Sequence, residues 1–185
     1  MLCRAAHRAV EAGFDGVEIH YAHRYLLNQF YSPLSNTRTD EYGGALENRI
    51  RLHLEILKAV RQEIGAGKAL LLRLGAVDYA PGGNTLEDAV AAAKLFEPAG
   101  LDLLDISGGM TGYIVKGREK WQGYYTPETA RLKQEVSIPV LMTGGITDPQ
   151  AAEEILKEGK ADLIGVGRAL LKDSNWAEKA LEGEE

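Results

Sequence analysis

The sequence predicts an α/β fold in which short parallel strands alternate with helices. Short apolar runs alternate along the chain with longer segments whose apolar residues recur three and four positions apart. The links from a helix to the next strand are short, whereas three links from a strand to the next helix are long. Glycine-rich sequences also follow the last two apolar runs. A strand–helix alternation this regular indicates a parallel sheet with right-handed crossover connections.

Residues that begin and end helices define the elements in more detail. Gly13 ends the first helix, Thr85 and Asp88 form a capping-box pattern, and Asp148 followed by Pro149 is typical of a helix start. The strands are continuous apolar runs, as expected for a sheet covered by helices. Helices are expected over residues 5–13, 46–65, 85–100, 127–136, from 149 onward and over 175–183, and strands over 15–20, 69–74, 101–107, 138–143 and 161–167.

Composition and charge limit the class of protein. The 185 residues are 45% apolar and 26% charged, a composition typical of one soluble globular domain with a core. No apolar run reaches the ~18 residues that a membrane span requires, and we expect no targeting segment at the amphipathic start. A net charge of −6 and the lack of a basic block disfavour nucleic-acid binding. The single cysteine, Cys3, cannot form an internal disulfide and fits a reducing cytoplasm.

Glycines at the ends of the last two strands predict a phosphate site. Gly144 and Gly145 follow the fourth strand, and Gly167 with Arg168 follows the fifth. Glycines let backbone amides approach a phosphate, and the short helix expected after Arg168 presents a positive N-terminus. The last two strands form such a phosphate cup in (β/α)8 barrels. The alternatives are turn geometry alone and a dinucleotide-binding fingerprint, although "GVGRAL" lacks the third glycine of that motif.

The number of strands predicts an incomplete barrel. A full (β/α)8 barrel has eight strands and typically ~250 residues, whereas this chain offers five strands in 185 residues. We therefore expect a partial (β/α)8 TIM barrel of five parallel strands with covering helices. Such a piece exposes two strand edges and an unfinished apolar interior, which favour association with a second copy or with a complementary chain.

The stretch "IHYAHRYLL" places three reactive side chains at the end of the first strand. His20 and His23 are three residues apart, and Tyr25 follows two residues later. The histidines could bind a metal, be packed or capped side chains, or hold a substrate oxygen. A metal needs a third and a fourth ligand, which no second cluster supplies, and Cys3 is expected on a distant helix. We therefore expect no metal site here.

Other titratable residues receive structural interpretations. His7 and His53 lie within predicted helices, and we expect them at the surface or in an interface. Asp105 is a single carboxylate near a strand end that could face the site or pair with a neighbour, and we assign it no catalytic role. Three carboxylates precede or begin the helix expected from residue 46 and are expected to shape the loop before it: Asp40, Glu41 and Glu47.

Five stretches that span nearly the whole chain carry a family resemblance: "AGFDGVEIHYAHRYLLNQFYSPLSNTRTDEYGGALENRIR", "LLLRLG", "LLDISGG", "IPVLMTGGI" and "ADLIGVGRALL". Together they resemble the old yellow enzyme family of FMN-dependent ene-reductases, also called NADH:flavin oxidoreductases. The match corresponds to the later part of the family's barrel, and the earlier strands have no counterpart. The resemblance implies one partial-barrel, FMN-binding oxidoreductase domain over residues 1–185.

The resemblance also implies roles for individual residues. His20 and His23 lie where the family binds the carbonyl or another electron-withdrawing oxygen of the substrate, and Tyr25 lies where it often places a proton donor. Arg73 lies where an arginine contacts the pyrimidine edge of the flavin. The family's phosphate cup corresponds to the residues already considered for that site, Gly144, Gly145, Gly167 and Arg168.

These residue types suit the implied reaction, which reduces activated C=C bonds of α,β-unsaturated carbonyl compounds with NADH or NADPH. Hydride from reduced FMN reaches the β-carbon, and two imidazole N–H donors stabilise the charge that grows on the carbonyl oxygen. A tyrosine hydroxyl can then protonate the α-carbon. The alternative is a truncated or engineered half-barrel that binds no flavin, has no activity and self-associates through its strand edges.

Two residues depart from the family pattern within the histidine motif. Arg24 stands where the family usually has glycine, and a positive φ at this position would strain an arginine and displace Tyr25. Tyr21 is bulkier than the small residue common there and would narrow the substrate pocket.

Overall fold

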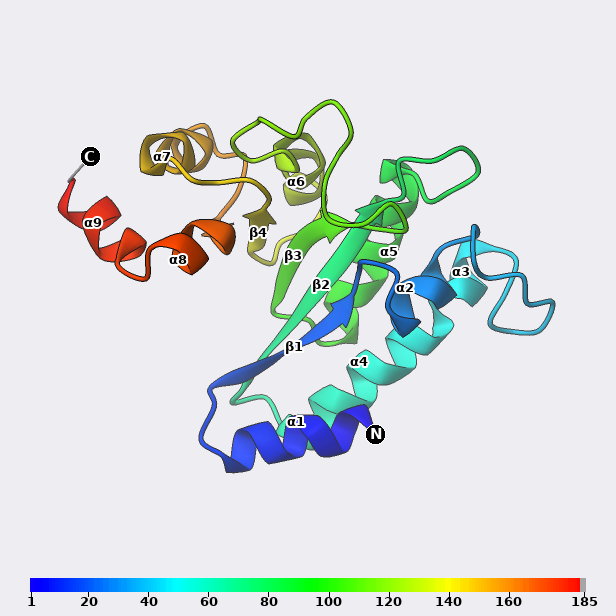
Figure 1. Cartoon of the computed structure of the whole chain (residues 1–185). Helices are drawn as coiled ribbons and strands as arrows, with labels where there is room; N and C mark the ends of the chain where they lie inside the picture. The colour runs from blue at the N-terminus through cyan, green and yellow to red at the C-terminus, as the bar shows by residue number, and fades with distance from the viewer. Residues whose placement is uncertain (184–185) are drawn as a thin grey trace.

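The computed structural model, which describes residues 1–183, contains one five-stranded parallel sheet (Figure 1). The spatial order of the strands, β1-β2-β3-β4-β5, equals their order along the chain. Each crossover therefore adds its strand on the same side, as in a barrel, whereas a doubly wound sheet reverses its strand order. The predicted α/β fold with five parallel strands is confirmed. The strands are β1 (Gly16–Tyr21), β2 (Ala69–Val77), β3 (Leu103–Gly108), β4 (Val140–Thr143) and β5 (Leu163–Gly165).

The helices follow the predicted order with two differences. The helix expected over residues 46–65 is divided at Ile50, and a short helix occupies part of the segment expected to be a loop. The predicted capping box at Thr85 is present, with Thr85 Oγ1 accepting from the Asp88 N–H at 3.2 Å. The helices are α1 (Leu2–Glu11), α2 (Leu26–Tyr31), α3 (Leu46–Arg49), α4 (Arg51–Ile64), α5 (Leu86–Phe96), the 3-10 turn Glu97–Ala99, α6 (Thr126–Lys133), α7 (Pro149–Lys157), α8 (Arg168–Lys172) and α9 (Trp176–Glu182).

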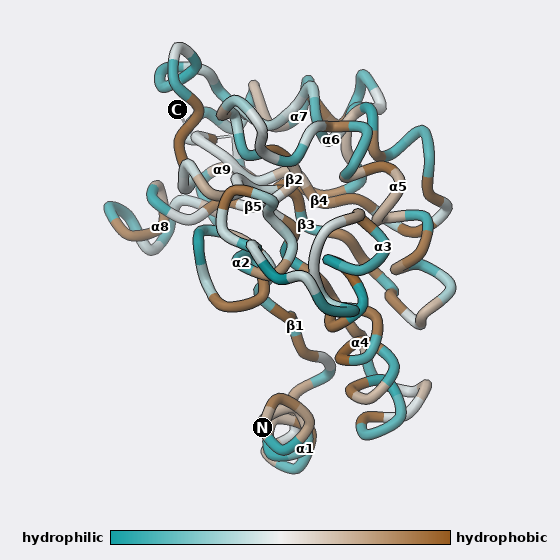
Figure 2. The backbone as a smooth tube through the Cα atoms, turned by 90° about the vertical axis from the view of Figure 1, so that its right-hand side faces the viewer, coloured by the Kyte–Doolittle hydropathy of each residue, from teal (hydrophilic) through white to brown (hydrophobic). Residues whose placement is uncertain are grey.

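Helices cover one face of the sheet and form the main core with it. α5 packs on β2, α6 packs on β4, and α4 packs between α1 and α5. The strand residues that face these helices, including Leu72, Leu74, Leu104 and Ile106, have no exposed surface. In Figure 2 the central strands are largely brown, which marks hydrophobic residues, while many outer loops are teal. Burial of these side chains is the main stabilising contribution that the sheet makes.

The sheet has two unpaired edges within the described residues. β1 pairs with β2 alone, and β5 pairs with β4 alone. A closed barrel has no such edges, because its first and last strands pair with each other. Among the helices described here, none is long and apolar enough to span a membrane.

His53 is in the core, which makes the predicted surface or interface position wrong. Its side chain has no exposed surface, and its ring lies 4.4 Å from the Tyr21 ring and 6.1 Å from the Phe96 ring, centroid to centroid. His53 Nε2 lies 2.9 Å from the Leu27 carbonyl oxygen. Desolvation lowers the pKa of His53 to about 4, so the imidazole is neutral in the folded protein. His7, in contrast, is exposed on α1, as predicted.

Candidate functional site

A cavity of about 940 Å³ lies at the face of the sheet opposite the helices. Every strand contributes a lining residue, namely Glu18, Arg73, Asp105, Thr143 and Gly165 for β1 to β5. The long segments that follow β1 and β3 and the residues after β4 and β5 complete its walls. Six of the eight residues predicted for the site line this cavity: His23, Arg73, Gly144, Gly145, Gly167 and Arg168.

The other two predicted residues adjoin the cavity through ring contacts. The His20 ring centroid lies 5.1 Å from that of His23 and 4.9 Å from that of Tyr25, with edge-to-face geometry in both pairs. Tyr25 is 62% exposed, so its hydroxyl remains accessible to a ligand. The structure therefore groups the histidine pair and the tyrosine at the end of β1.

A tight turn after β1 brings the two histidines together. His23 and Arg24 both have left-handed backbone conformations, with φ of 56° and 66°. Asn28 Oδ1 accepts from the Arg24 N–H at 2.9 Å, and the Arg24 side chain donates to the Met110 carbonyl. The positive φ that would strain an arginine is thus present, and these hydrogen bonds stabilise the turn against that strain.

Hydrogen bonds orient both imidazole rings. His20 Nδ1 accepts from the Ala22 N–H at 3.1 Å, which leaves the proton of the neutral ring on Nε2. His23 Nε2 lies 2.5 Å from the Ser107 hydroxyl at the end of β3. Ser107 was not among the predicted residues, although it lies in the "LLDIS" stretch at a strand end where polar residues gather.

Burial and a nearby cation keep both histidines neutral. Desolvation, followed by repulsion from Arg73 and from His20 when that ring is protonated, lowers the pKa of His23 to about 4. Desolvation and the charge of Arg73 also lower the pKa of His20. Neutral imidazoles near pH 7 can each present one N–H donor to a ligand, as an oxyanion site requires.

Gly144 and Gly145 occupy positions that no other residue fits. Both have positive φ, at 126° and 80°. A Cβ on Gly144 would lie 2.6 Å from Tyr124 Cε2, and one on Gly145 would lie 2.7 Å from the Trp121 carbonyl oxygen. The turn after β4 therefore packs its bare backbone closely against Tyr124 and the Trp121 carbonyl at the wall of the cavity, a fit that only glycine allows.

Arg168 faces the same part of the cavity from the start of α8. Its Nη2 donates to the Tyr124 hydroxyl at 3.1 Å, and that hydroxyl donates to the Tyr113 carbonyl at 2.7 Å. Space is open where a Cβ on Gly167 would lie, so the backbone there is accessible. Tyr124 holds Arg168 and packs on both glycines after β4, a role that the sequence reasoning missed because the residue lies in an irregular loop.

Titratable side chains of three neighbouring strands lie next to one another at the cavity. His20, Arg73 and Asp105 occupy one register row across β1, β2 and β3. Arg73 Nε lies 3.4 Å from Asp105 Oδ2, and Asp105 is 3% exposed. Desolvation raises the pKa of Asp105 to about 8 against the lowering effect of Arg73, and the carboxylate of Glu18 adds to the rise.

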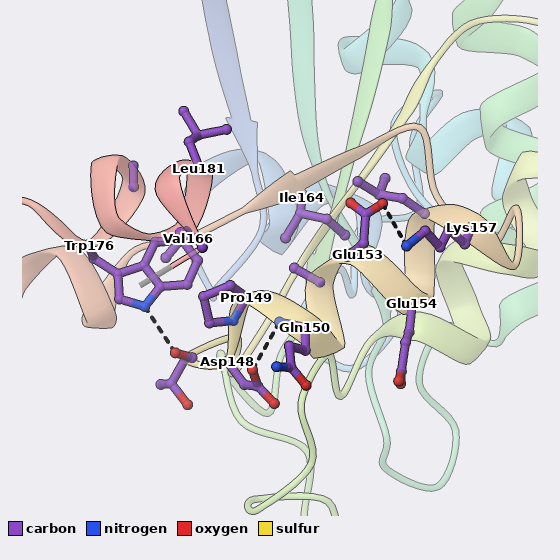
Figure 3. Close-up of a pocket in the computed structure, with 16 residues that line it drawn as sticks. Asp148, Pro149, Gln150, Glu153, Glu154, Lys157, Ile164, Val166, Trp176 and Leu181 are labelled. Carbon is purple, nitrogen blue, oxygen red and sulfur yellow. Dashed lines mark hydrogen bonds and ion pairs between the residues drawn. The ribbon is translucent and has the colours of Figure 1, made fainter. Parts of the chain in front are cut away.

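A second cavity of about 1070 Å³ lies among α7, β5 and α9 (Figure 3). Figure 3 shows Trp176, Val166, Ile164 and Leu181 around it, and Trp176 Nε1 donates to the Thr147 carbonyl oxygen at 2.9 Å. None of the residues predicted for the site lines this cavity. In the described part of the chain, no group of three or more His, Cys, Asp or Glu residues could hold a metal ion.

The fold is that of part of an α/β barrel. Its first cavity is lined by residues at and after the carboxyl ends of the strands, where α/β-barrel enzymes have their active sites. The profile of the NADH:flavin oxidoreductase / NADH oxidase family matches residues 2–185. The chain therefore belongs to this family of FMN-dependent oxidoreductases, which confirms the predicted resemblance and cofactor class.

Curated relatives and solved structures agree with this assignment. The chain is 42% identical to an NADH oxidase of Thermoanaerobacter brockii, over 97% of this chain and 28% of that protein. It is 46% identical to an NADPH dehydrogenase of a Geobacillus species, over 92% of this chain and 49% of that protein. The chain thus spans about half or less of the length of these relatives.

Two solved structures show the same architecture. The structure of a 2-naphthoyl-CoA reductase complex matches with a TM-score of 0.93 and 33% identity, over 99% of this chain and 28% of that one. The old yellow enzyme homologue from Zymomonas mobilis matches with a TM-score of 0.80 and 28% identity, over 100% of this chain and 51% of that one. The predicted partial barrel is therefore confirmed.

Proposed function

We propose that this chain carries the flavin-binding and substrate-binding part of an NAD(P)H-dependent ene-reductase that acts on α,β-unsaturated carbonyl compounds. The observation that carries the proposal is the convergence of His23, Arg73, the glycine turn after β4 and Arg168 on one cavity. The single half-buried cysteine, Cys3, supports the cytoplasmic location that we also propose.

The residues present fit FMN. Gly167 leaves backbone open at one end of the cavity, Gly144 and Gly145 line the same end, and Arg168 would add a positive charge there for the phosphate. Arg73 supplies a second cation from β2 for the pyrimidine edge of the flavin. A cavity of about 940 Å³ is of the size that holds a cofactor. When bound, reduced FMN would supply the hydride and be reduced again by NADH or NADPH.

The histidine pair would bind the substrate oxygen. The Nε2–H of His20 is free to donate, because Nδ1 of that ring already accepts from Ala22. If the Ser107 hydroxyl donates to His23 Nε2, the proton of that neutral ring lies on Nδ1. Two N–H donors aimed at one oxygen would stabilise the negative charge that develops as the β-carbon accepts hydride.

Tyr25 would donate the proton that completes the reduction. Its ring packs edge-to-face against that of His20, whose N–H is part of the proposed oxyanion site, and the residue is exposed to solvent. The proton would pass from this hydroxyl to the α-carbon and be replaced from water. The hydrogen bonds of Arg24 hold the turn from which Tyr25 projects.

A second candidate function follows from the unpaired edges of β1 and β5. A half-barrel that binds no flavin could associate with a second copy, or with a complementary chain, by pairing these edges. Sedimentation analysis separates the possibilities: an oligomer without bound flavin supports this candidate, whereas a monomer counts against it.

Flavin binding tests the proposed enzyme directly. We expect FMN to remain with the protein after removal of excess cofactor, and NADPH to bleach its absorbance. Arg168→Met should weaken FMN binding by about tenfold, which corresponds to ~1.4 kcal/mol, through the loss of a phosphate-binding charge. Lys157→Met, on α7 beside the second cavity, is the matched control and should change nothing. A protein that retains no FMN contradicts the proposal for this chain.

A further inference from the structure

Asp105 is a buried carboxyl group that the proposed reaction does not use. It lies in the middle of β3 on the cavity side, with 3% of its surface exposed. Its Oδ1 has no hydrogen-bond partner among the described residues. An ionised carboxylate in such a place costs free energy unless it is fully paired. Burial in the fold therefore favours the protonated form of Asp105.

Arg73 is the nearest cation, yet its geometry with Asp105 is incomplete. The 3.4 Å between Arg73 Nε and Asp105 Oδ2 joins the two charges without a hydrogen bond, and Nε itself has no hydrogen-bond partner. The guanidinium remains partly exposed toward the cavity, where its charge also affects His20 and His23. The guanidinium of Arg73 can therefore interact either with the Asp105 carboxyl group or with a ligand in the cavity.

The other groups around Asp105 compensate a negative charge on it only in part. Glu18 from β1 raises the pKa of Asp105, whereas the Thr143 hydroxyl from β4 lowers it. That hydroxyl donates its own hydrogen bond to the Ile106 carbonyl oxygen at 2.6 Å. Arg73 is the only cation among the groups that act on its titration, and α5 and α6 pack on the opposite, helix-covered face. The other charged or titratable groups that line the same cavity are His23, Glu119, Lys120, Arg168, Lys172 and the phenols of Tyr113, Tyr124 and Tyr125.

We propose that Asp105 is a positioning residue that keeps its proton at neutral pH and so leaves the positive charge of Arg73 directed into the cavity. This inference rests on the proposed function, because the ligand that Arg73 would face is the flavin. Loss of the proton would make Asp105 an ion-pair partner that competes with the ligand for Arg73. The cavity should therefore hold an anionic flavin less strongly as Asp105 ionises.

The first test measures the titration of the Asp105 carboxyl group and needs no flavin. Carbon-13 NMR of Asp-labelled protein should show one carboxyl that titrates near pH 8 and is absent in Asp105→Asn. Arg73→Met should move this titration to higher pH, and Glu18→Gln should move it to lower pH, because Arg73 lowers and Glu18 raises the pKa of Asp105. The control Asp15→Asn removes an exposed carboxyl and should leave this titration unchanged. An Asp105 that titrates at the ordinary value for aspartate overturns the proposal.

The second test measures the consequence for FMN. Between pH 7 and pH 9.5 the FMN affinity of the unaltered protein should fall by about tenfold, while that of Asp105→Asn should stay constant because its amide cannot ionise. A purely structural role for Asp105 would change affinity without changing this pH profile. Equal pH profiles in the two proteins overturn the proposal. If neither binds FMN while the carbon-13 titration is as expected, the proposed function fails and the assignment of the proton stands.

Discussion

The two faces of the sheet are built from the same strands but differ in the burial and polarity of their side chains. On the helix-covered face, Leu72, Leu104 and Ile106 have no exposed surface and belong to the main hydrophobic core. On the cavity face, the adjacent positions Arg73 and Asp105 hold titratable side chains and line an open space. Successive strand residues point to opposite faces of the sheet, so one largely apolar strand contributes side chains to both the core and the cavity.

The difference shows how this molecule separates stability from chemistry. Desolvation on the helix-covered face stabilises the sheet, because the side chains there leave water without losing hydrogen bonds. Desolvation on the cavity face instead shifts protonation: it lowers the pKa of His23 and raises that of Asp105. Substitutions on the first face should therefore change the free energy of unfolding, and those on the second should change ligand and proton binding.

The largest expected effect on the free energy of unfolding comes from shortening a buried side chain on the helix-covered face. Leu72→Ala should lower the free energy of unfolding by about 3 kcal/mol, because it removes buried methyl groups and leaves a cavity in the core. Leu71→Ala, one residue earlier on the cavity face and only partly buried, is the matched control and should cost less than about 1.5 kcal/mol. Urea unfolding of both variants measures the difference, and equal losses would contradict the division between the faces.

A pH-dependent loss of stability should distinguish the buried histidine from exposed ones. The pKa of His53 is lowered to about 4, so the folded state binds fewer protons than the unfolded state between pH 6.5 and pH 4. The free energy of unfolding should fall by roughly 3 kcal/mol from this residue as the pH decreases across that window. Urea unfolding at several pH values should show a smaller decrease for His53→Gln.

The control for this experiment is His7→Gln on the exposed helix α1, which should keep the full decrease. The raised pKa of Asp105 acts in the opposite direction, because a carboxyl that keeps its proton when folded favours the folded state at low pH. All three proteins share that contribution, so it cancels in the comparison. A His53→Gln variant with an unchanged pH profile would contradict the interpretation of His53 as a neutral core residue.

The smallest expected effect concerns the turn at the edge of the cavity. Arg24→Gly should raise the free energy of unfolding by about 1 kcal/mol, because glycine adopts a φ of 66° without steric cost. Arg24→Ala, which loses the bond to the Met110 carbonyl and keeps the strain, should give no gain. Urea unfolding provides the measurement, and a loss of stability in Arg24→Gly would show that the side-chain hydrogen bond outweighs the strain.

Sequence reasoning predicted the fold correctly, and it named six residues that line the candidate site. Local signals such as the capping box of Thr85 and the glycines after β4 act within a few residues and can be recognised without a structure. His53 was misplaced because its helix carries a polar residue at a position that faces the Tyr21 and Phe96 rings, and burial depends on those distant partners. Ser107 and Tyr124 were missed because their roles arise from contacts across strands and loops.

The sequence by itself determined the alternation of strands and helices, the glycine turns and the spacing of His20, His23 and Tyr25, since each depends on residues close together in the chain. Only the tertiary structure decided which of these side chains share a cavity and which charges they experience there. Asp105 illustrates the reason: its own sequence context is an apolar run, whereas its protonation depends on Arg73, Glu18 and the burial that three strands create together. Desolvation and charge pairing act through space, so they become defined only when the strands pair.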